Sequence, residues 1–264
     1  MKSKQPWAIP LNFFKLLTAG GKILLAFYDY LVLYLGLAWL GVLCLGWTLI
    51  TIILYPILPR LQARRLGRLG IMTGFRIYLS TLSLSQRCTF DLSALDALRD
   101  EVPLIIAPNH PSLLDAVMVI SRLPNVACIM KAELMGNMFL GAGSRFASYI
   151  RNEPVRKMMS LAAEDLKNNS HLLLFPEGTR TVGGAISPFT GCVGLIAQRA
   201  GVPVQTVFIE TNTDYLSKGW PLFRKPAMPI YYRIRLGRRF DPPQDGHRFI
   251  AELEEYFAKE LAPA

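Results

Sequence analysis

The chain has 264 residues, of which 52% are hydrophobic. This length suits one α/β domain of about 200 residues plus a membrane anchor, and nothing in it calls for a second core. Lys and Arg number 29 against 19 Asp and Glu, so the net charge is +10 and anionic partners are expected. Such partners include acidic lipid, a phosphorylated substrate, an acidic carrier protein and nucleic acid. So apolar a composition indicates contact with lipid, and a membrane is therefore favoured over nucleic acid.

The cysteines and two of the histidines give no sign of a metal or disulfide site. No C-x-x-C spacing occurs, and the four cysteines lie far apart in apolar surroundings: Cys44, Cys88, Cys128 and Cys192. They are predicted to be reduced, as in a protein that faces the cytosol. His171 and His247 have no carboxylate at a plausible local spacing, so both are expected to be structural or solvated.

The N-terminal third has the composition of a membrane anchor. Residues 1–29 mix lysines with apolar and aromatic side chains, as interfacial segments do, and no small-residue site suited to signal cleavage follows the apolar run. From Tyr30 to Pro59 there is no charged side chain. One ionisable group at the centre of a membrane helix costs about 2.5–3.5 kcal/mol, so this gap predicts hydrocarbon contact.

The anchor could be one tilted span or a hairpin that enters and leaves the bilayer on one side; a buried core helix is the alternative. Glycines interrupt the run and Pro56 lies near its end, while both flanks are basic, which favours the cytoplasm for both ends and hence a re-entrant pair of short helices. Residues 60–79 are then expected to form a basic helix along the anionic leaflet.

Beyond this anchor the sequence predicts an α/β domain at residues 83–264, preceded by the interfacial segment, anchor and basic linker helix at 1–82. The expected sheet is mixed, mostly parallel and flanked by helices. Strands are predicted near 88–91, 104–107, 126–130, 147–150, 171–175, 204–210 and 229–236. Helices are predicted near 112–122, 132–140, 154–168, 191–200 and 246–261.

A candidate base lies where the apolar run 105–107 ends. His110 follows Pro108 and Asn109, and Asp115 lies five residues later, in the first turn of the next helical pattern. A histidine titrates near neutrality, and a carboxylate on its second nitrogen would fix its tautomer. The same residues also fit a simpler interpretation, because Ser112 to Asp115 is an S-x-x-D capping box that only starts a helix. Asn109 is expected to hold the turn.

A second polar cluster follows the apolar run 172–175, again after a proline. Glu177, Gly178, Thr179 and Arg180 are consecutive there. Because ligands bind at the carboxyl ends of parallel strands, the two clusters are expected to meet at one edge of the sheet. Gly178 would allow close backbone approach to an anion, and Arg180 could grip phosphate.

Together these blocks, Asn109-His110 with Asp115 and Phe175 to Arg180, resemble the two signatures of the glycerolipid acyltransferase superfamily. The bacterial 1-acyl-sn-glycerol-3-phosphate acyltransferases are the most similar group. Tyr149-Ile150-Arg151 and Val202-Pro203-Val204 resemble two weaker blocks of that family. The order and spacing agree from about residue 85 to 240, although the residues leading into Arg151 depart from the usual pattern.

The resemblance implies a chemistry for residues 83–264. His110 would deprotonate an acceptor hydroxyl as it attacks an acyl thioester, with Asp115 orienting the ring and no acyl-enzyme. The acceptor would be lysophosphatidic acid, giving phosphatidic acid, and the donor acyl-CoA or acyl carrier protein. No cofactor or metal is implied. The substrate-binding candidates are Lys131, Arg151, Glu177, Gly178, Thr179 and Arg180. The expected location is the inner membrane, with this domain facing the cytoplasm.

Three other functions compete with this one. The same chemistry could act on another lysolipid, such as a lyso-aminolipid. The fold could also serve as a non-catalytic membrane scaffold in which Asp115 only caps a helix. A metal-dependent hydrolase using His110, Asp115 and Glu177 is the weakest alternative, because one histidine without H-E-x-x-H spacing makes a poor site.

Overall fold

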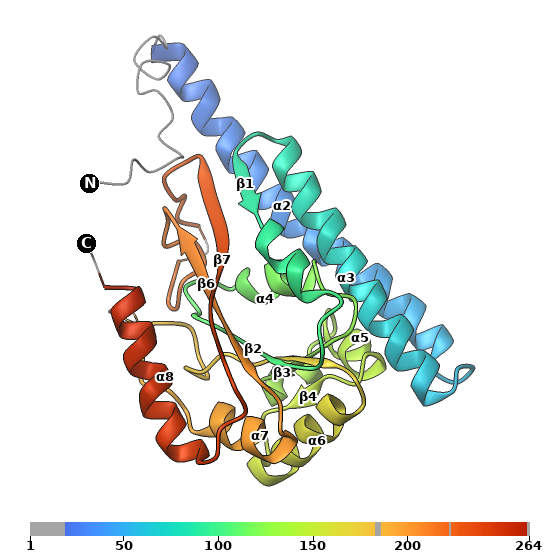
Figure 1. Cartoon of the computed structure of the whole chain (residues 1–264). Helices are drawn as coiled ribbons and strands as arrows, with labels where there is room; N and C mark the ends of the chain where they lie inside the picture. The colour runs from blue at the N-terminus through green and yellow to red at the C-terminus, as the bar shows by residue number, and fades with distance from the viewer. Residues whose placement is uncertain (1–18, 183–185, 222, 263–264) are drawn as a thin grey trace.

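A seven-stranded sheet in the order β1-β7-β6-β2-β5-β3-β4 forms the centre of the computed structural model, which describes residues 19–182, 186–221 and 223–262 (Figure 1). The strands are β1 Cys88–Asp91, β2 Ile105–Pro108, β3 Val126–Met130, β4 Ile150–Arg151, β5 His171–Leu173, β6 Val204–Thr211 and β7 Ile230–Phe240. Strands β6, β2, β5, β3 and β4 run parallel, whereas β7 is antiparallel to β6 and parallel to β1. The predicted mixed, mostly parallel sheet is confirmed.

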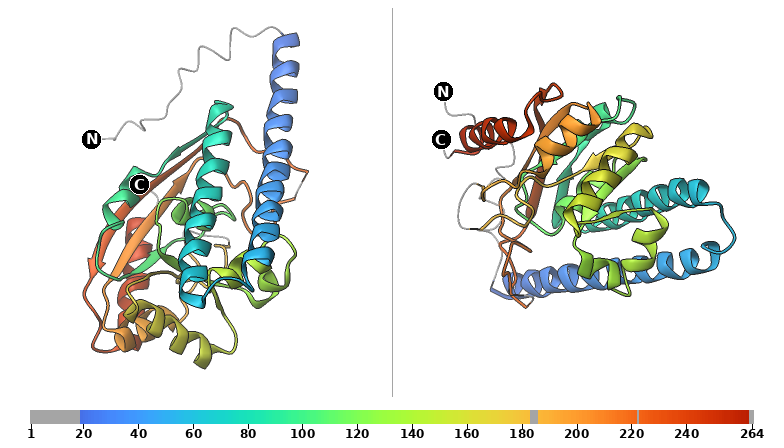
Figure 2. Two further views of the ribbon diagram at one scale, coloured as in Figure 1. Left: turned by 90° about the vertical axis from the view of Figure 1, so that its right-hand side faces the viewer. Right: turned by 90° about the horizontal axis from the view of Figure 1, so that it is seen from below.

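Helices cover both faces of this sheet (Figure 2). The α-helices are α2 Ala19–Leu54, α3 Arg60–Leu84, α4 Asp115–Ile120, α5 Gly141–Phe146, α6 Val155–Lys167, α7 Cys192–Ala200 and α8 Gly246–Glu260, and the 3₁₀ helices are η1 Ser93–Leu98 and η2 Ala132–Gly136. Side chains alternate across β2: Ile106 packs on the side of α3 and α4, and Ile105 and Ala107 pack on the side of α6, α7 and α8. A strand buried on both faces reads as a continuous apolar run.

Two predicted elements differ in the structure. The helix expected at 132–140 divides into η2 and α5, and the strand expected at 147–150 begins only at Ile150. Between η2 and α5 the chain turns at Asn137, whose side chain accepts from the Phe139 amide and whose carbonyl accepts from Gly141. Such a side-chain bond to the local backbone competes with a continuous helix.

The expected pair of short helices between Tyr30 and Pro59 is wrong, because α2 is one continuous helix of 36 residues. The turn comes only after Leu54, near Pro56 and Pro59, and α3 then runs back along α2. Gly36 faces α3 here, since a Cβ at this position would lie 2.7 Å from the Leu82 side chain. Residues 20–54 are long and apolar enough to cross a membrane by length and composition. The interfacial segment predicted at the N-terminus falls mainly at residues 1–18, outside the described residues.

The basic helix α3 faces the protein more than the sequence indicated. Arg68 is 1% exposed and donates to Asp165, Asn125, Ser170 and the Ala147 carbonyl. Arg64 pairs with the same Asp165 carboxylate. The expectation that this helix lies along a lipid surface is therefore wrong for these two arginines, whose charge fixes α3 to the domain.

Replacing Arg68 by methionine should destabilise the fold by about 3–5 kcal/mol, because it leaves buried acceptors without their cation. Thermal unfolding in detergent, converted to free energy, measures the loss. Arg65→Met is the matched control, since Arg65 is an exposed arginine of the same helix and its removal should change stability by no more than about 0.5 kcal/mol. Equal losses in the two variants would contradict the role assigned to Arg68.

Candidate active site

The two polar clusters predicted from the sequence lie at the ends of neighbouring strands. Strand β2 pairs with β5 in parallel, so both chains leave the sheet at the same edge. His110 follows β2 there, and residues 174–180 follow β5. The Thr181 amide donates to the His110 carbonyl over 2.8 Å, which joins the two clusters through the backbone. The expectation that parallel strands bring them together is confirmed.

His110 and Asp115 form a hydrogen-bonded pair. The distance from His110 Nδ1 to Asp115 Oδ2 is 2.8 Å, and the same oxygen accepts the Ser112 amide over 2.7 Å. The structure therefore contains both predicted arrangements at once: Asp115 closes on the amide at the start of the helix and also holds the imidazole. Because Asp115 accepts a hydrogen bond from Nδ1, it favours the tautomer whose proton is on Nδ1. In that tautomer Nε2 carries no proton and can accept one from a substrate.

Burial changes the acidity of Asp115. Its side chain has no exposed area, and Oδ1 has no hydrogen-bond partner among the described residues. Desolvation raises the pKa of Asp115 to about 6, although its bonds to His110 and Ser112 act in the opposite direction. The carboxylate is therefore charged at neutral pH.

Phe175 fixes the plane of the histidine ring. The two rings stack with centroids 3.8 Å apart and planes 18° from parallel. The His110 side chain is 16% exposed, and Nε2 makes no hydrogen bond to the residues that the structure describes. Sequence reasoning did not assign a role to Phe175, although this residue ends the second apolar run and begins the second motif block.

Glu177 holds the loops together, and no hydrogen bond within the described residues joins it to Arg180. Its Oε1 accepts from the His110 amide over 3.1 Å and from the Thr181 hydroxyl over 2.8 Å, and its Oε2 accepts from the Ser187 amide over 2.8 Å. With a side chain 97% buried by these contacts, its role here is to place His110. The expected contact of Glu177 with Arg180 is not made. Its expected contact with a substrate hydroxyl stays a prediction.

Gly178 and Thr179 form the turn after Glu177. Gly178 has φ +66°, a left-handed conformation that favours glycine, and it donates to the Phe175 carbonyl. Gly178 is exposed at this edge, and Thr179 is half-buried.

Arg180 donates from Nη1 to the carbonyls of Leu216 and Ser217, over 2.8 and 2.9 Å. Its Nε and Nη2 make no hydrogen bond to the described residues, so part of the guanidinium remains available for an anion. The segment that carries these carbonyls also contacts the turn after β2, because the Ser112 hydroxyl donates to the Tyr215 carbonyl and the Leu113 amide to that of Leu216. Nothing in the sequence indicated this contribution from residues 215–217.

Lys131 and Arg151 lie at the same edge but farther along it. They stand at the ends of β3 and β4, and both are exposed. With strands about 4.8 Å apart, β3 is about 10 Å and β4 about 14 Å from β2. Neither side chain pairs with an acid among the described residues. Asn109, by contrast, holds the end of β2 as expected, because its amide exchanges two hydrogen bonds with the Ile209 backbone.

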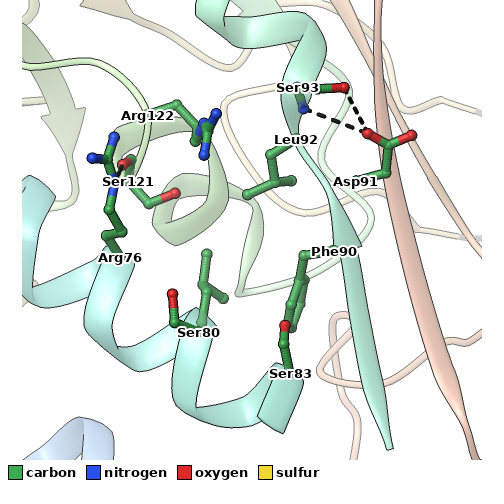
Figure 3. A pocket seen from close by; sticks show the side chains of 10 residues that line it. Arg76, Ser80, Ser83, Phe90, Asp91, Leu92, Ser93, Ser121 and Arg122 are labelled. Atoms are coloured by element: carbon green, nitrogen blue, oxygen red, sulfur yellow. Dashed lines mark hydrogen bonds between the residues drawn. The ribbon is translucent and has the colours of Figure 1, made fainter. Parts of the chain in front are cut away.

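None of these residues lines the surface pocket of about 390 Å³ shown in Figure 3. That pocket lies between α3, β1 and the end of α4, whereas Asp115 stands at the start of α4. Its arginines are engaged within the protein, Arg76 with the Ser121 carbonyl and Arg122 with Asp96. In the described parts of the chain, no group of three or more His, Cys, Asp or Glu side chains is placed to hold a metal.

Comparisons with known proteins agree with the class of fold and site described above. Residues 90–210 match the family model described as Acyltransferase. A crystal structure of the 1-acyl-sn-glycerophosphate (LPA) acyltransferase PlsC from Thermotoga maritima has the same fold, with a TM-score of 0.60 and 21% identity over 90% of this chain and 94% of that one. These similarities confirm the predicted resemblance to the glycerolipid acyltransferases.

Two curated relatives come from Pseudomonas aeruginosa. A 1-acyl-sn-glycerol-3-phosphate acyltransferase is 25% identical over 79% of this chain and 80% of its own length. A lyso-ornithine lipid O-acyltransferase is 30% identical over 42% of this chain and 45% of its own length. The chain spans about half the length of the matched relatives that share 30% identity or more.

Replacing Glu177 by glutamine should lower stability by about 1.5–3 kcal/mol, the usual value of hydrogen bonds to a charged group. The glutamine side chain has one acceptor oxygen in place of two, so it cannot accept from the backbone N–H groups of both His110 and Ser187. Thermal unfolding in detergent measures the loss. Thr181→Val removes a single hydroxyl donor and should cost less, about 0.5–1.5 kcal/mol. A larger loss in the valine variant would contradict the role of Glu177.

The buried Asp115 carboxyl should make stability depend on pH. Its pKa is raised from 3.8 to about 6 by burial, so between these values the folded chain holds a proton that the unfolded chain has released. The stabilisation from this group is therefore complete below about pH 4 and is lost as the pH rises through about 6. Asp115→Asn lacks this titration, and its unfolding free energy relative to wild type should rise between pH 4 and 6. A difference that stays constant over this range would contradict the raised pKa.

Proposed function

We propose that this protein transfers a fatty acyl group from an acyl thioester to the free hydroxyl of lysophosphatidic acid, which gives phosphatidic acid. The observation that carries the proposal is the His110–Asp115 pair at the carboxyl edge of the sheet, with Nε2 available and Arg180 in the cluster bonded to the His110 backbone. The 1-acyl-sn-glycerol-3-phosphate acyltransferase that spans most of the chain supports this acceptor.

In the proposed reaction, His110 Nε2 takes the acceptor's hydroxyl proton as the oxygen attacks the thioester carbonyl. The Asp115 carboxylate stabilises the imidazolium. Collapse of the tetrahedral intermediate breaks the carbon–sulfur bond, and the imidazolium returns its proton to the thiolate, so the products are the ester and the free thiol. General-base help of this kind is worth about 10²–10⁴ in rate. The Phe175 stack and the Asp115 bond hold the ring ready for this transfer.

Arg180 is the cation best placed for the acceptor's phosphate. One of its terminal nitrogens is used by two backbone carbonyls, which fix the plane of the guanidinium, and the rest of the fork can bind two phosphate oxygens. Lys131 and Arg151 stand two and three strands away from β2, so they suit a more distant anionic group of acceptor or donor. Acyl-CoA and acyl carrier protein both remain candidate donors.

The N-terminal helix supports a site at a membrane surface. Large apolar side chains stand out from α2 on the side that does not pack on the domain: Ile23, Leu24, Phe27, Leu35, Val42, Leu49 and Ile53 are each at least 56% exposed. In an inner membrane this face would lie in lipid, with the acyltransferase domain on the cytoplasmic side. The lysolipid would then reach His110 from the bilayer.

One of the curated relatives supports a second candidate acceptor lipid. The lyso-ornithine lipid O-acyltransferase matches this chain at 30% identity, so the same chemistry on a lyso-aminolipid is the alternative function. That headgroup carries no phosphate, and Arg180 would have no phosphomonoester to bind.

Replacing His110 by alanine should lower kcat at least about 100-fold while the protein stays folded, because the base is lost. The assay is acyl transfer from a labelled acyl thioester to lysophosphatidic acid and to lyso-ornithine lipid in parallel. His247→Ala is the control, since His247 is exposed on α8 and should be dispensable. Full acyl transfer by the alanine variant would contradict the role of His110 as the base. A wild-type protein that transfers no acyl group would leave the scaffold alternative, and activity that survives exhaustive chelation would remove the metal-dependent hydrolase.

A further inference from the structure

An acidic residue lies buried in the mostly apolar helix α2. Asp29 is 3% exposed and pairs with two cations, Arg87 Nε at 2.5 Å and Lys225 Nζ at 2.9 Å. Burying a carboxylate is costly unless it is paired, and an ionisable residue in a membrane-associated helix commonly has a functional partner. The two cations come from different parts of the chain, so each connects Asp29 to a different segment.

Lys225 belongs to the segment between β6 and β7, residues 212–229, which we call the strap; the structure describes all of it but residue 222. The strap reaches α2 in both views of Figure 2. Besides the ion pair, Lys225 lies 5.8 Å from the centre of the Tyr30 ring, and the Phe223 ring lies 6.2 Å from that of Tyr34. One end of the strap is thus fixed to α2.

The other end of the strap reaches the candidate active site. The carbonyls of Leu216 and Ser217 accept from Arg180, and the Tyr215 carbonyl accepts from the hydroxyl of Ser112, three residues before Asp115. Among the described residues, the Arg180 guanidinium makes no other hydrogen bond or ion pair. The position of these two carbonyls therefore decides where the remaining N–H groups of Arg180 point.

The two ends of the strap are braced against each other. The Tyr215 and Trp220 rings meet edge to face with centroids 6.1 Å apart. Trp220 Nε1 donates to the Arg224 carbonyl, and the Arg224 guanidinium lies over the Trp220 ring at 4.9 Å. The ion pair at Lys225 is therefore connected to the carbonyls at Leu216 through packed side chains rather than through a free loop.

We propose that Asp29 and Lys225 are positioning residues for the acceptor site: their ion pair fixes the strap, and the strap aims Arg180 at the acceptor's phosphate. This inference rests on the proposed function. It makes the membrane-associated helix α2 part of substrate recognition in addition to its role in attachment. Asp29 acts at a distance, through Lys225 and Arg180, and touches no reacting atom.

Arg87 provides a matched control within the same ion-pair cluster. It lies directly before β1, and its side chain fixes Asp29 to the connection from α3 rather than to the strap. Lys225→Met and Arg87→Met each remove one cation and leave Asp29 with the other. A purely structural cluster would respond in the same way to both changes.

The test is steady-state kinetics of the full-length detergent-solubilised protein with lysophosphatidic acid as the varied acceptor. Lys225→Met should raise the acceptor KM at least tenfold with kcat changed less than threefold, and Lys225→Arg should restore it. Arg87→Met should lower the melting temperature while the acceptor KM stays within twofold of wild type. Adding Lys225→Met to Arg180→Gln should not raise KM further, because Arg180 would no longer transmit the effect.

The outcomes separate this inference from the proposed function. A wild-type protein that acylates no lysophosphatidic acid overturns the function itself. An active wild type whose two methionine variants shift KM equally, or whose Lys225 variant leaves KM unchanged, overturns the positioning role. Should Lys225→Met fail to fold, Phe223→Ala replaces it, since Phe223 is 81% exposed and the change removes its ring contact with Tyr34. This variant should raise the acceptor KM in the same direction, and an unchanged KM contradicts the proposal.

Discussion

The geometry of the site depends on the joining of two strand ends through one carboxylate. Glu177 leaves β5 and accepts the His110 amide at the end of β2, while the Thr181 amide donates to the His110 carbonyl. Since both backbone polar groups of His110 are bound, the histidine has little freedom apart from its side-chain torsions. Asp115 and Phe175 then restrict the ring itself. A histidine held in this way would need little reorganisation in order to act as the proposed base.

Buried charges connect the apolar N-terminal helices to this site. Arg68 fixes α3 to the end of α6 through Asp165, and Asp29 fixes α2 to the strap through Lys225. In each ion pair, the partner charge compensates for the water that a buried ion loses on folding. Removing one partner leaves the other charge buried and unpaired, so it lowers the free energy of unfolding by more than the intact pair contributes. The helices α2 and α3 are therefore fixed to the domain by specific contacts, in addition to apolar packing.

The local patterns that predicted strands and motifs succeeded because they depend on near neighbours. The apolar runs ending at Pro108 and Pro176 indicated buried parallel strands, and the His110 to Asp115 spacing placed both residues at one helix start. The pattern failed for α2, where glycines suggested breaks: Gly36 instead faces Leu82 of α3, a contact 46 positions away in sequence that no local periodicity contains. The positive charge of α3 likewise suggested lipid for Arg68, whose partners lie 57 to 102 residues later.

The sequence by itself determined the class of sheet, the two motif blocks and the candidate base, because these follow from hydrophobic period, turn residues and spacing along the chain. The tertiary structure alone decided what Glu177 and Arg180 bind. Glu177 faces the His110 backbone and Arg180 the strap carbonyls because β2 and β5 are adjacent and the link from β6 to β7 passes over their ends. Backbone amides and carbonyls occur at every residue, so a sequence carries no mark of which of them a side chain will meet.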